Sequence, residues 1–375
     1  MHMNQKSKLA LAAAIVAVMV LMVAVFGYRE RPETAPGGAG AWLPGLKEQL
    51  GELRRLRLQS SAEGVTLVHG AAGWGVEERA GYPADFGQLE KLLQALAGAQ
   101  LVERKTAKPE FFDRLGLTDI EQPDSEAVQL EIWSDAAQPI ARVLIGKAAE
   151  GRGGRYVRAV ADTQTWLIDT APEPMASPAD WIDRSLLGVD FARVATVARV
   201  LGGKPEFSAV RAVAGEASLA VATLPAGKVP RYQSVFDAAA RAILTAEPED
   251  VRKAGELDFG AAAETRVGGF DGLALTVRAL KGKDGNWVTI AAAAGDPVPR
   301  ADAPPETPQP EDVAAEAERL NGRLGGWAFK VSDYVYGELA KGLADYVQDE
   351  QPAAGATPAP GAQPQSQSRM ETDDE

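Results

Sequence analysis

The stretch from residue 64 to residue 98, GVTLVHGAAGWGVEERAGYPADFGQLEKLLQALAG, decides the fold of this chain. Two short alternating apolar runs, Gly64–His69 and Trp74–Glu77, are joined by a Gly-rich turn, which is the pattern of a β-hairpin. From Phe86 onward the apolar residues recur at helical spacing instead. The stretch therefore predicts a hairpin followed by an amphipathic helix.

The ends of this helix are also marked. Asp85 is placed to cap its first turn, Gln88 completes a capping-box-like pair, and Gly98 is placed to end it. The apolar face is predicted to consist of Phe86, Leu89, Leu92, Leu93 and Leu96.

The rest of the first half continues as strands with short helices. Strands are predicted at Gln100–Lys105, Val128–Trp133, Ile140–Ile145, Tyr156–Val160 and Thr165–Ile168. Short helices are expected at Pro109–Leu115 and at Pro178–Leu187, the second of which carries Trp181. This half is predicted to be an α+β domain over residues 45–188.

The second half echoes that order. Strands are predicted at Phe207–Val213, Ser218–Thr223, Val251–Leu257, Leu273–Leu280 and Trp287–Ala292. Helices are predicted from an apolar face over 232–243, at Glu311–Leu324 and at Asp333–Val347, with Trp327 between the last two. We therefore expect two similar α+β domains, each an antiparallel sheet covered by helices, with the second over residues 189–348.

Composition excludes several function classes. The 375 residues carry a net charge of -13, which argues against nucleic acid as a partner, because a phosphate backbone needs a basic face. The chain has no Cys, so disulfides, thiolate metal sites and cysteine nucleophiles are excluded. It has two His, one of them at position 2, which leaves little for His-based catalysis or metal binding. We predict no catalytic, cofactor or metal site.

Leu9–Phe26 is an unbroken apolar run of 18 residues, which as a helix would reach about 27 Å. A buried soluble helix would need a polar face, and a cleaved signal peptide would need a small-x-small cleavage site in place of Phe26-Gly27-Tyr28. The run therefore predicts a single-pass membrane anchor within residues 1–29.

The charges that flank the anchor are nearly balanced, with Lys6 and Lys8 before it and Arg29 and Arg31 after it. The short N-terminus with its α-amine favours a cytoplasmic N-terminus, so the rest of the chain is expected in the periplasm, attached to the inner membrane. Residues 30–44 are Pro/Gly-rich and predict a linker. Residues 349–375 predict a disordered acidic tail.

Several local patterns resemble sites without meeting their requirements. His69 has no G-x-S-x-G elbow to accompany it. Gly151–Arg155 lacks the Lys-Ser/Thr and the following helix of a phosphate-binding loop, so a mobile hairpin turn is the simpler interpretation. Its two arginines, Arg152 and Arg155, could still contact an anionic partner.

Acidic residues form two further groups. Glu121, Asp124 and Glu126 surround Pro123 without the spacing of a calcium loop. Asp180 and Asp183 are three residues apart, as paired carboxylates on one helix face would be, and helix capping by Asp180 is the plainer interpretation.

A set of motifs carries a resemblance to a known family. The motifs are 81-GYPADF-86, 101-LVERKT-106, 112-FDRLGL-117, 166-WLID-169, 181-WIDRSLL-187 and 326-GWAFKV-331. Together they resemble the bacterial domain-of-unknown-function family numbered four-three-four-zero, from about Leu46 to Val347. The family has no established activity, and its members are typically membrane-anchored proteins encoded beside gliding-motility-type ABC transporter subunits. The resemblance implies an accessory component of such a transporter.

Three function hypotheses follow. The first is a non-enzymatic accessory component that contacts the permease and ATPase of an ABC-type transport or envelope system; the small-xxx-small pairs Ala10/Ala14 and Ala13/Ala17 could dock its anchor on transporter helices. The alternative is a module that binds an envelope glycan, lipid or peptide in a groove between the two domains. The third, an envelope hydrolase, lacks a visible nucleophile–base pair.

Overall fold

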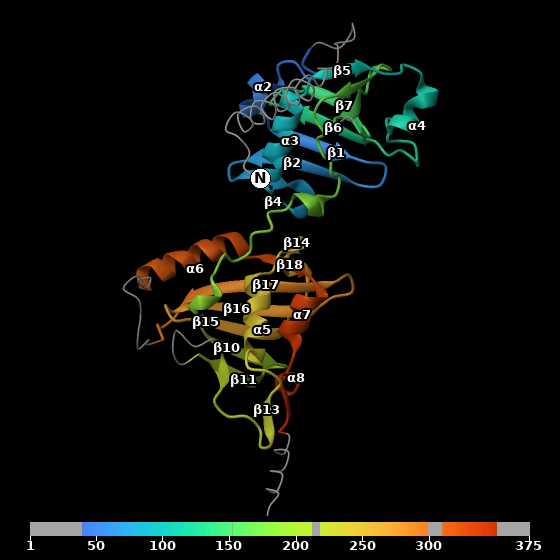
Figure 1. Cartoon of the computed structure of the whole chain (residues 1–375). Coiled ribbons are helices and arrows are strands. Elements are labelled where there is room, and N and C mark those ends of the chain that lie inside the picture. Colours follow the sequence, from blue (N-terminus) through green and yellow to red (C-terminus); the bar gives the residue numbers. More distant parts are fainter. Residues whose placement is uncertain (1–39, 152, 212–217, 299–309, 351–375) are drawn as a thin grey trace, which may run out of the picture. The chain divides into compact units, whose positions relative to one another are not determined.

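The computed structural model describes residues 40–151, 153–211, 218–298 and 310–350. This part of the chain is an α+β protein with antiparallel sheets and few helices, which confirms the predicted class (Figure 1). The chain divides into two compact units. Unit 1 comprises the described residues up to Ser185 together with Pro248–Lys253, and unit 2 comprises Leu186–Glu247 and the described residues from Ala254 onward.

The sheet of unit 1 has nine strands in the order β4-β3-β2-β1-β6-β7-β8-β9-β5. Their bounds are Arg55–Gln59 (β1), Gly64–Gly70 (β2), Gly73–Val76 (β3), Tyr82–Pro83 (β4), Leu101–Arg104 (β5), Val128–Trp133 (β6), Ala141–Ala148 (β7), Arg155–Ala159 (β8) and Thr165–Ile168 (β9). All of the neighbouring pairs are antiparallel. The interior strand β1 contributes to the core: Leu56 lies opposite both Leu67 and Ile132, and all three are buried.

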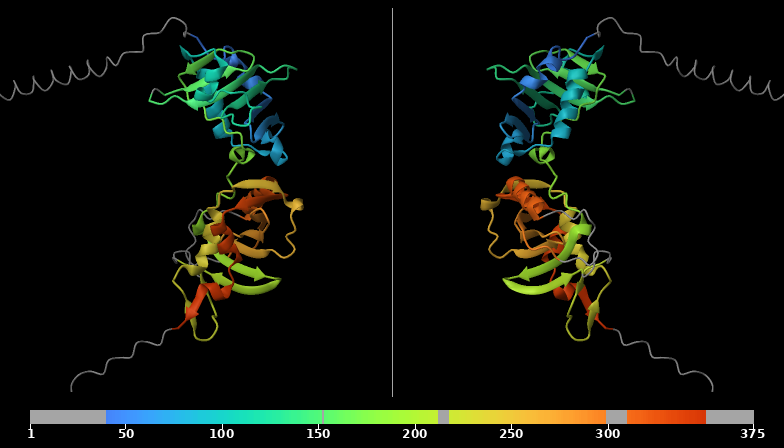
Figure 2. Two further views of the ribbon diagram at one scale, coloured as in Figure 1. Left: turned by 90° about the vertical axis from the view of Figure 1, so that its right-hand side faces the viewer. Right: turned by 90° about the vertical axis from the view of Figure 1, so that its left-hand side faces the viewer.

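Helix α3 (Phe86–Gly98) lies along this sheet, as Figure 2 shows from two sides. The predicted cap is confirmed, because the Asp85 side chain accepts from the backbone N–H of Gln88. Leu89, Leu92 and Leu96 are buried, as the periodicity predicts. Phe86 is not: its side chain is 62% exposed. This part of the prediction is wrong, whereas Tyr82 and Trp181 on the two adjoining segments are both fully buried.

The predicted helix at Pro178–Leu187 is also shorter than expected. Only Pro178–Trp181 (η4) is helical, as one 3₁₀ turn. The chain then becomes extended, because Ile182 forms an antiparallel bridge with Ala84. In contrast, the prediction of a short helix before Gly116 is confirmed by Pro109–Phe111 (η3) and Phe112–Leu115 (α4).

The second large sheet has eight strands in the order β12-β11-β10-β15-β16-β17-β18-β14. Their bounds are Val194–Leu201 (β10), Lys204–Val210 (β11), Ala220–Val221 (β12), Asp250–Lys253 (β14), Ala263–Gly269 (β15), Leu273–Lys281 (β16), Asn286–Ala294 (β17) and Trp327–Val331 (β18). A separate two-stranded sheet joins Lys228–Pro230 (β13) to Val347–Asp349 (β19). Where a strand is predicted over Val251–Leu257, the chain forms the shorter strand β14 and then the 3₁₀ turn Ala254–Glu256 (η7).

Among the described residues, unit 2 has four α-helices. In this unit Ala238–Leu244 (α5) packs against Asp333–Ala340 (α7), and α7 also contacts β15, β16 and β17. Pro310–Leu324 (α6) runs along β17, where the Asn321 side chain pairs with both backbone groups of Ala292. The fourth helix is Leu343–Tyr346 (α8). Two predictions fail here: Tyr232 is 56% exposed, and the helix expected over 333–347 is interrupted at Lys341–Gly342.

A buried arginine ties α7 to the sheet of unit 2. Arg199 on β10 is fully buried, and its Nη2 donates to the Glu338 carbonyl at 2.9 Å. The Tyr346 hydroxyl donates to the same carbonyl at 3.1 Å. Burial lowers the pKa of Arg199 and raises the pKa of Tyr346 to about 12. The two donors together hold the C-terminal end of α7 in place.

The predicted anchor and most of the predicted linker lie outside the described residues. None of the helices in the described ranges is both long and apolar enough to cross a membrane. At the end of the predicted linker, Ala41 forms a bridge with Gln100 beside β5. Asp349, which the sequence analysis assigned to the tail, is instead the last residue of β19, and Lys228 lowers its pKa through an ion pair.

Candidate functional site: a groove beside α3

Two stretches of unit 1 that are far apart in sequence meet at the start of α3. Ala84 forms an antiparallel bridge with Ile182, and the backbone N–H of Asp85 donates to the Trp181 carbonyl at 2.8 Å. The Asp183 N–H returns a bond to the Pro83 carbonyl at 2.9 Å. The two sequence motifs YPADF and WID are thereby brought into direct backbone pairing.

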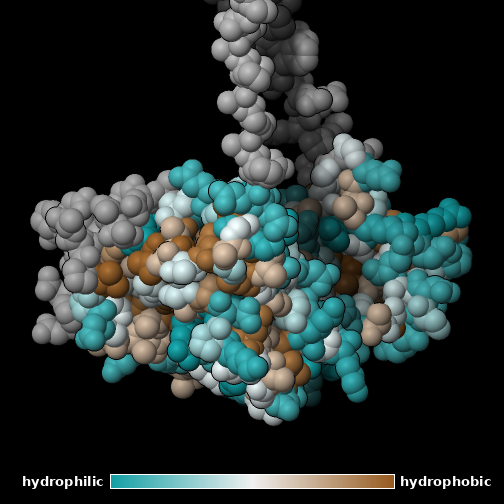
Figure 3. Space-filling view, turned by 90° about the horizontal axis from the view of Figure 1, so that it is seen from below, coloured by the Kyte–Doolittle hydropathy of each residue, from teal (hydrophilic) through white to brown (hydrophobic). Residues whose placement is uncertain are grey.

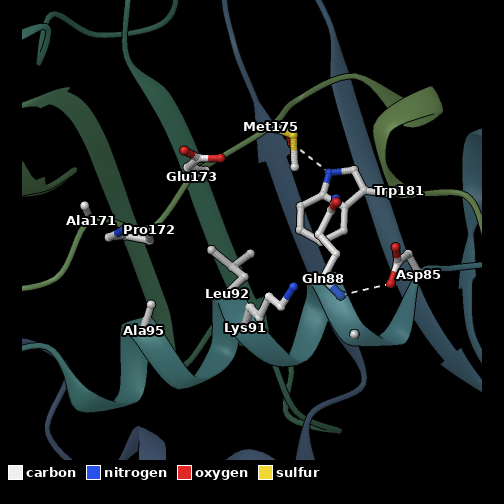
Figure 4. A pocket seen from close by; sticks show the side chains of 11 residues that line it. Asp85, Gln88, Lys91, Leu92, Ala95, Ala171, Pro172, Glu173, Met175 and Trp181 are labelled. Atoms are coloured by element: carbon white, nitrogen blue, oxygen red, sulfur yellow. Dashed lines mark hydrogen bonds between the residues drawn. The ribbon is translucent and has the colours of Figure 1, made fainter.

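A groove of about 420 Å³ lies between α3 and the segment 171–175, which we call the strap. Figure 4 shows the strap running alongside the helix, with Ala171 near Ala95 and Met175 near the start of the helix. The two walls therefore run in opposite directions.

Side-chain hydrogen bonds hold the chain to α3 at both ends of the groove. Beyond one end, the Thr170 hydroxyl donates to the Ala95 carbonyl at 3.0 Å. Beyond the other end, Gln88 Nε2 donates to the Asp180 carbonyl at 2.9 Å. The Gln88 side chain thus holds the segment that follows the strap and does not make the reciprocal bond of a capping box, which corrects the prediction for this side chain.

The floor of the groove is apolar and rigid. The indole of Trp181 is fully buried, and its Nε1 donates to the Met175 carbonyl at 2.8 Å (Figure 4). Leu92 from the helix and Pro172 from the strap are also buried. This floor fits apolar groups that are packed against it.

The rim carries the charge. Asp85 is occupied, because its Oδ1 accepts from the Gln88 N–H at 2.9 Å. Lys91 and Glu173 are exposed on opposite walls. Burial lowers the pKa of Arg155, and the negative charge of Glu173 acts against that shift. Within the described part of the chain, neither the Lys91 amine nor the Glu173 carboxylate has an ion pair or hydrogen bond, so each wall of the groove carries one free charge.

Removing the cap of α3 is expected to weaken this wall. In Asp85→Ala the N–H of Gln88 loses its acceptor, and we expect the free energy of unfolding to fall by about 1 kcal/mol. Urea unfolding of the purified protein would measure the change. Asp85→Ser, which keeps an acceptor, should recover most of the loss, and equal losses in both variants would contradict the capping role.

A second hollow in unit 1, of about 430 Å³, has a structural arginine in its wall. Arg158 is buried, stacks on the Phe112 ring at 4.7 Å, and donates to the carbonyls of Leu117 and Asp162 and to the Asp119 carboxylate. These bonds join two loops, the one after α4 and the one between β8 and β9, so Arg158 acts as a tie between them. Elsewhere, Figure 3 shows apolar and hydrophilic residues intermixed on the face seen from below.

The other residues that the sequence singled out are dispersed. Ala10, Ala13, Ala14, Ala17 and Arg152 lie outside the described residues. The guanidinium of Arg155 donates to the Gly146 carbonyl at 3.0 Å. Gly151, Gly153 and Gly154 all have positive φ, as a tight turn between β7 and β8 requires.

His69 and the acidic candidates have local roles. The His69 ring lies 5.2 Å from that of Trp74. Asp180 does not cap a helix, contrary to the prediction, and its carboxylate lies 3.9 Å from Arg184. Asp183 accepts from the N–H of Ser185, and Glu126 pairs with Lys147. The described residues contain no group of three or more His, Cys, Asp or Glu placed to hold a metal ion.

Comparison with known proteins gives one family model and one relative. The family model described as "Domain of unknown function (DUF4340)" matches residues 74–258, a range that includes α3, the strap and Trp181. Natriuretic peptides B of Ovis aries is 33% identical over 112 residues, which cover 28% of this chain and 86% of that protein. No solved structure matches.

Proposed function

From the premise that this chain belongs to the DUF4340 family, we propose that it is a non-enzymatic accessory component of an ABC-type transport or envelope system. In this proposal, residues 9–26 form a single inner-membrane helix, and two similar α+β domains follow it in the periplasm. The chain acts by contacts with the permease and ATPase subunits, to which the Ala10/Ala14 and Ala13/Ala17 pairs contribute inside the membrane.

The groove beside α3 is the observation that carries this proposal. Three of its hydrogen-bonding side chains are used to build the groove: Asp85 caps the helix, Gln88 holds the segment after the strap at Asp180, and Trp181 binds Met175. Among the described residues that line the groove, an apolar floor, the Lys91 amine and the Glu173 carboxylate remain for a partner. Such a surface fits recognition of another molecule, and its volume lies in the range of about 300–1,000 Å³ that is typical of binding pockets.

The order of elements supports the proposed similarity of the two domains. In unit 1, the β2–β3 hairpin precedes α3. In unit 2, the β10–β11 hairpin precedes α5. Each helix thus follows a hairpin of its own unit.

Co-purification tests the proposed partners. We expect the full-length protein, extracted from its native membrane in mild detergent, to bring an ATPase and a multi-span permease with it, because complexes of this kind associate through helix packing and soluble contacts. Replacing residues 9–26 with an unrelated anchor should lower the recovery severalfold, as measured by quantitative mass spectrometry. Recovery of the protein alone, after crosslinking too, would contradict the proposal.

The volume of the groove also favours the second candidate, a module that binds an envelope glycan, lipid or peptide. The described groove lies within unit 1. A ligand there would raise the melting temperature of the purified protein without any transporter subunit present.

A further inference from the structure

We infer that the groove beside α3 receives an extended stretch of a partner polypeptide that bears an acidic side chain opposite Lys91. This inference rests on the proposed function, in that the chain works by contacts with other proteins, and it names the kind of segment that its groove would bind.

The length of the groove suits a short extended segment. From Gln88 to Ala95 the helical wall advances seven residues, which at ~1.5 Å per residue is about 10 Å. An extended chain rises about 3.3 Å per residue, so roughly three residues match this wall. The walls carry small residues at Gly87, Ala95 and Ala171, so the backbone of a bound segment can approach them closely.

The strap offers free backbone groups to such a segment. The N–H groups of Ala171 and Glu173 and the carbonyl of Ala171 have no hydrogen-bond partner within the described part of the chain. In an extended chain, the polar groups of residues i and i+2 point to the same side. Pro172 and Pro174 have no N–H, so pairing along the opposite side of the strap would lack donors. The pattern therefore permits pairing on one side only, as an added strand requires.

The free charge of Lys91 on the helical wall favours an acidic side chain on the bound segment. Asp85 is occupied by its cap, and Glu173 lies on the strap, on the wall opposite Lys91. Lys91 stands on the helical wall with its amine unpaired among the described residues. A carboxylate on the bound segment would pair with it at the partly desolvated rim, whereas a cation there would be repelled.

Apolar residues of the segment also have places to pack. The buried floor of Trp181, Leu92 and Pro172 takes one aliphatic side chain. The expected segment is therefore an acidic residue flanked by aliphatic or aromatic ones.

Selection from a random heptapeptide phage library, against the full-length protein in nanodiscs, tests the inference. We expect enrichment of sequences with Asp or Glu beside aliphatic residues. One enriched peptide is then synthesised with a fluorophore, and its Kd is measured by anisotropy. Lys91→Glu should weaken binding at least about tenfold, and selection on this variant should yield basic peptides instead.

Two pairs of variants separate the groove from other surfaces. Ala171→Pro removes the backbone N–H that the segment would bind and should weaken binding about tenfold, whereas Ala171→Gly keeps that N–H and should bind normally. Lys108→Glu makes the same charge change at another exposed lysine of unit 1 and should leave Kd unchanged. Thermal melts of each variant check that it is folded.

The outcomes also separate this inference from the proposed function. No enrichment over empty nanodiscs, or binding that neither Lys91→Glu nor Ala171→Pro weakens, would overturn the inference. If transporter subunits still co-purify with Ala171→Pro at full yield, the accessory role stands and the groove is not its contact. If peptides bind as expected but no subunit co-purifies, the groove stands and the proposed transporter partner falls.

Discussion

Replacing Gly154 with alanine is expected to destabilise unit 1 by about 4 kcal/mol or more, which would place it among the most damaging single substitutions. Gly154 has φ of +83° at the start of β8, and an added Cβ would lie 1.9 Å from the Ile168 carbonyl oxygen. That oxygen belongs to the backbone of β9, which pairs with β8. The clash can be relieved only by moving one strand away from the other.

Gly153 provides a matched control one residue earlier. Its φ is +69°, yet nothing lies within 4 Å of an added Cβ. Gly153→Ala should therefore cost only the strain of a left-handed alanine, about 1 kcal/mol. Urea unfolding, together with hydrogen exchange of peptides from β8 and β9, measures both variants. Equal losses would mean that the packing of this turn against β9 is not as described.

Replacing Trp181 with alanine is expected to cost about 3–5 kcal/mol and to open the floor of the groove. The indole is fully buried beside α3, so its removal leaves a large cavity. It also removes the donor to the Met175 carbonyl, which loosens the strap. We therefore expect the melting temperature to fall and the Kd of the bound peptide to rise in the same variant.

Trp181→Phe separates these two effects. The ring of phenylalanine fills much of the space, but it has no N–H to offer Met175. We expect a smaller loss of about 1–2 kcal/mol, from the missing hydrogen bond and the residual cavity. A Phe variant as unstable as the Ala variant would show that the hydrogen bond, and not the burial, dominates at this position.

Signals confined to a few neighbouring residues predicted their elements well. Val128–Trp133 and Thr165–Ile168 are strands at the predicted bounds, and α3 begins at Phe86 and ends at Gly98 as its cap and glycine indicate. These patterns depend on alternation, helical spacing and capping, which are all local. The α+β class follows from their order along the chain.

Some strands have a local signal that the predictions above do not use. Arg55–Gln59 alternates charged or polar residues with leucine, and it is the interior strand β1 with Leu56 and Leu58 buried. Val194–Leu201 and Ala263–Gly269 are strands for which no element is predicted. Trp327 is predicted to lie between two helices, but it opens strand β18. Alternation over five residues indicates β1, whereas the sequence WAFKV of β18 does not alternate.

The groove had no local signal. It depends on Gln88 reaching Asp180, which is 92 positions away, and on Ile182 pairing with Ala84. Phe86 is exposed despite its helical spacing, whereas Trp181, which these contacts bring beside the start of α3, is fully buried. Tertiary packing of this kind overrides periodicity, and a single sequence does not reveal it.

Because Gln88 and Asp180 are 92 positions apart, the groove forms only some time after α3 has been synthesised. At about 5–20 residues per second, roughly 5–20 s pass between the synthesis of α3 and that of the residues that close the strap over it. During this interval the chain has a helix but no groove. A nascent chain therefore lacks this surface until unit 1 has been made as far as the WID motif.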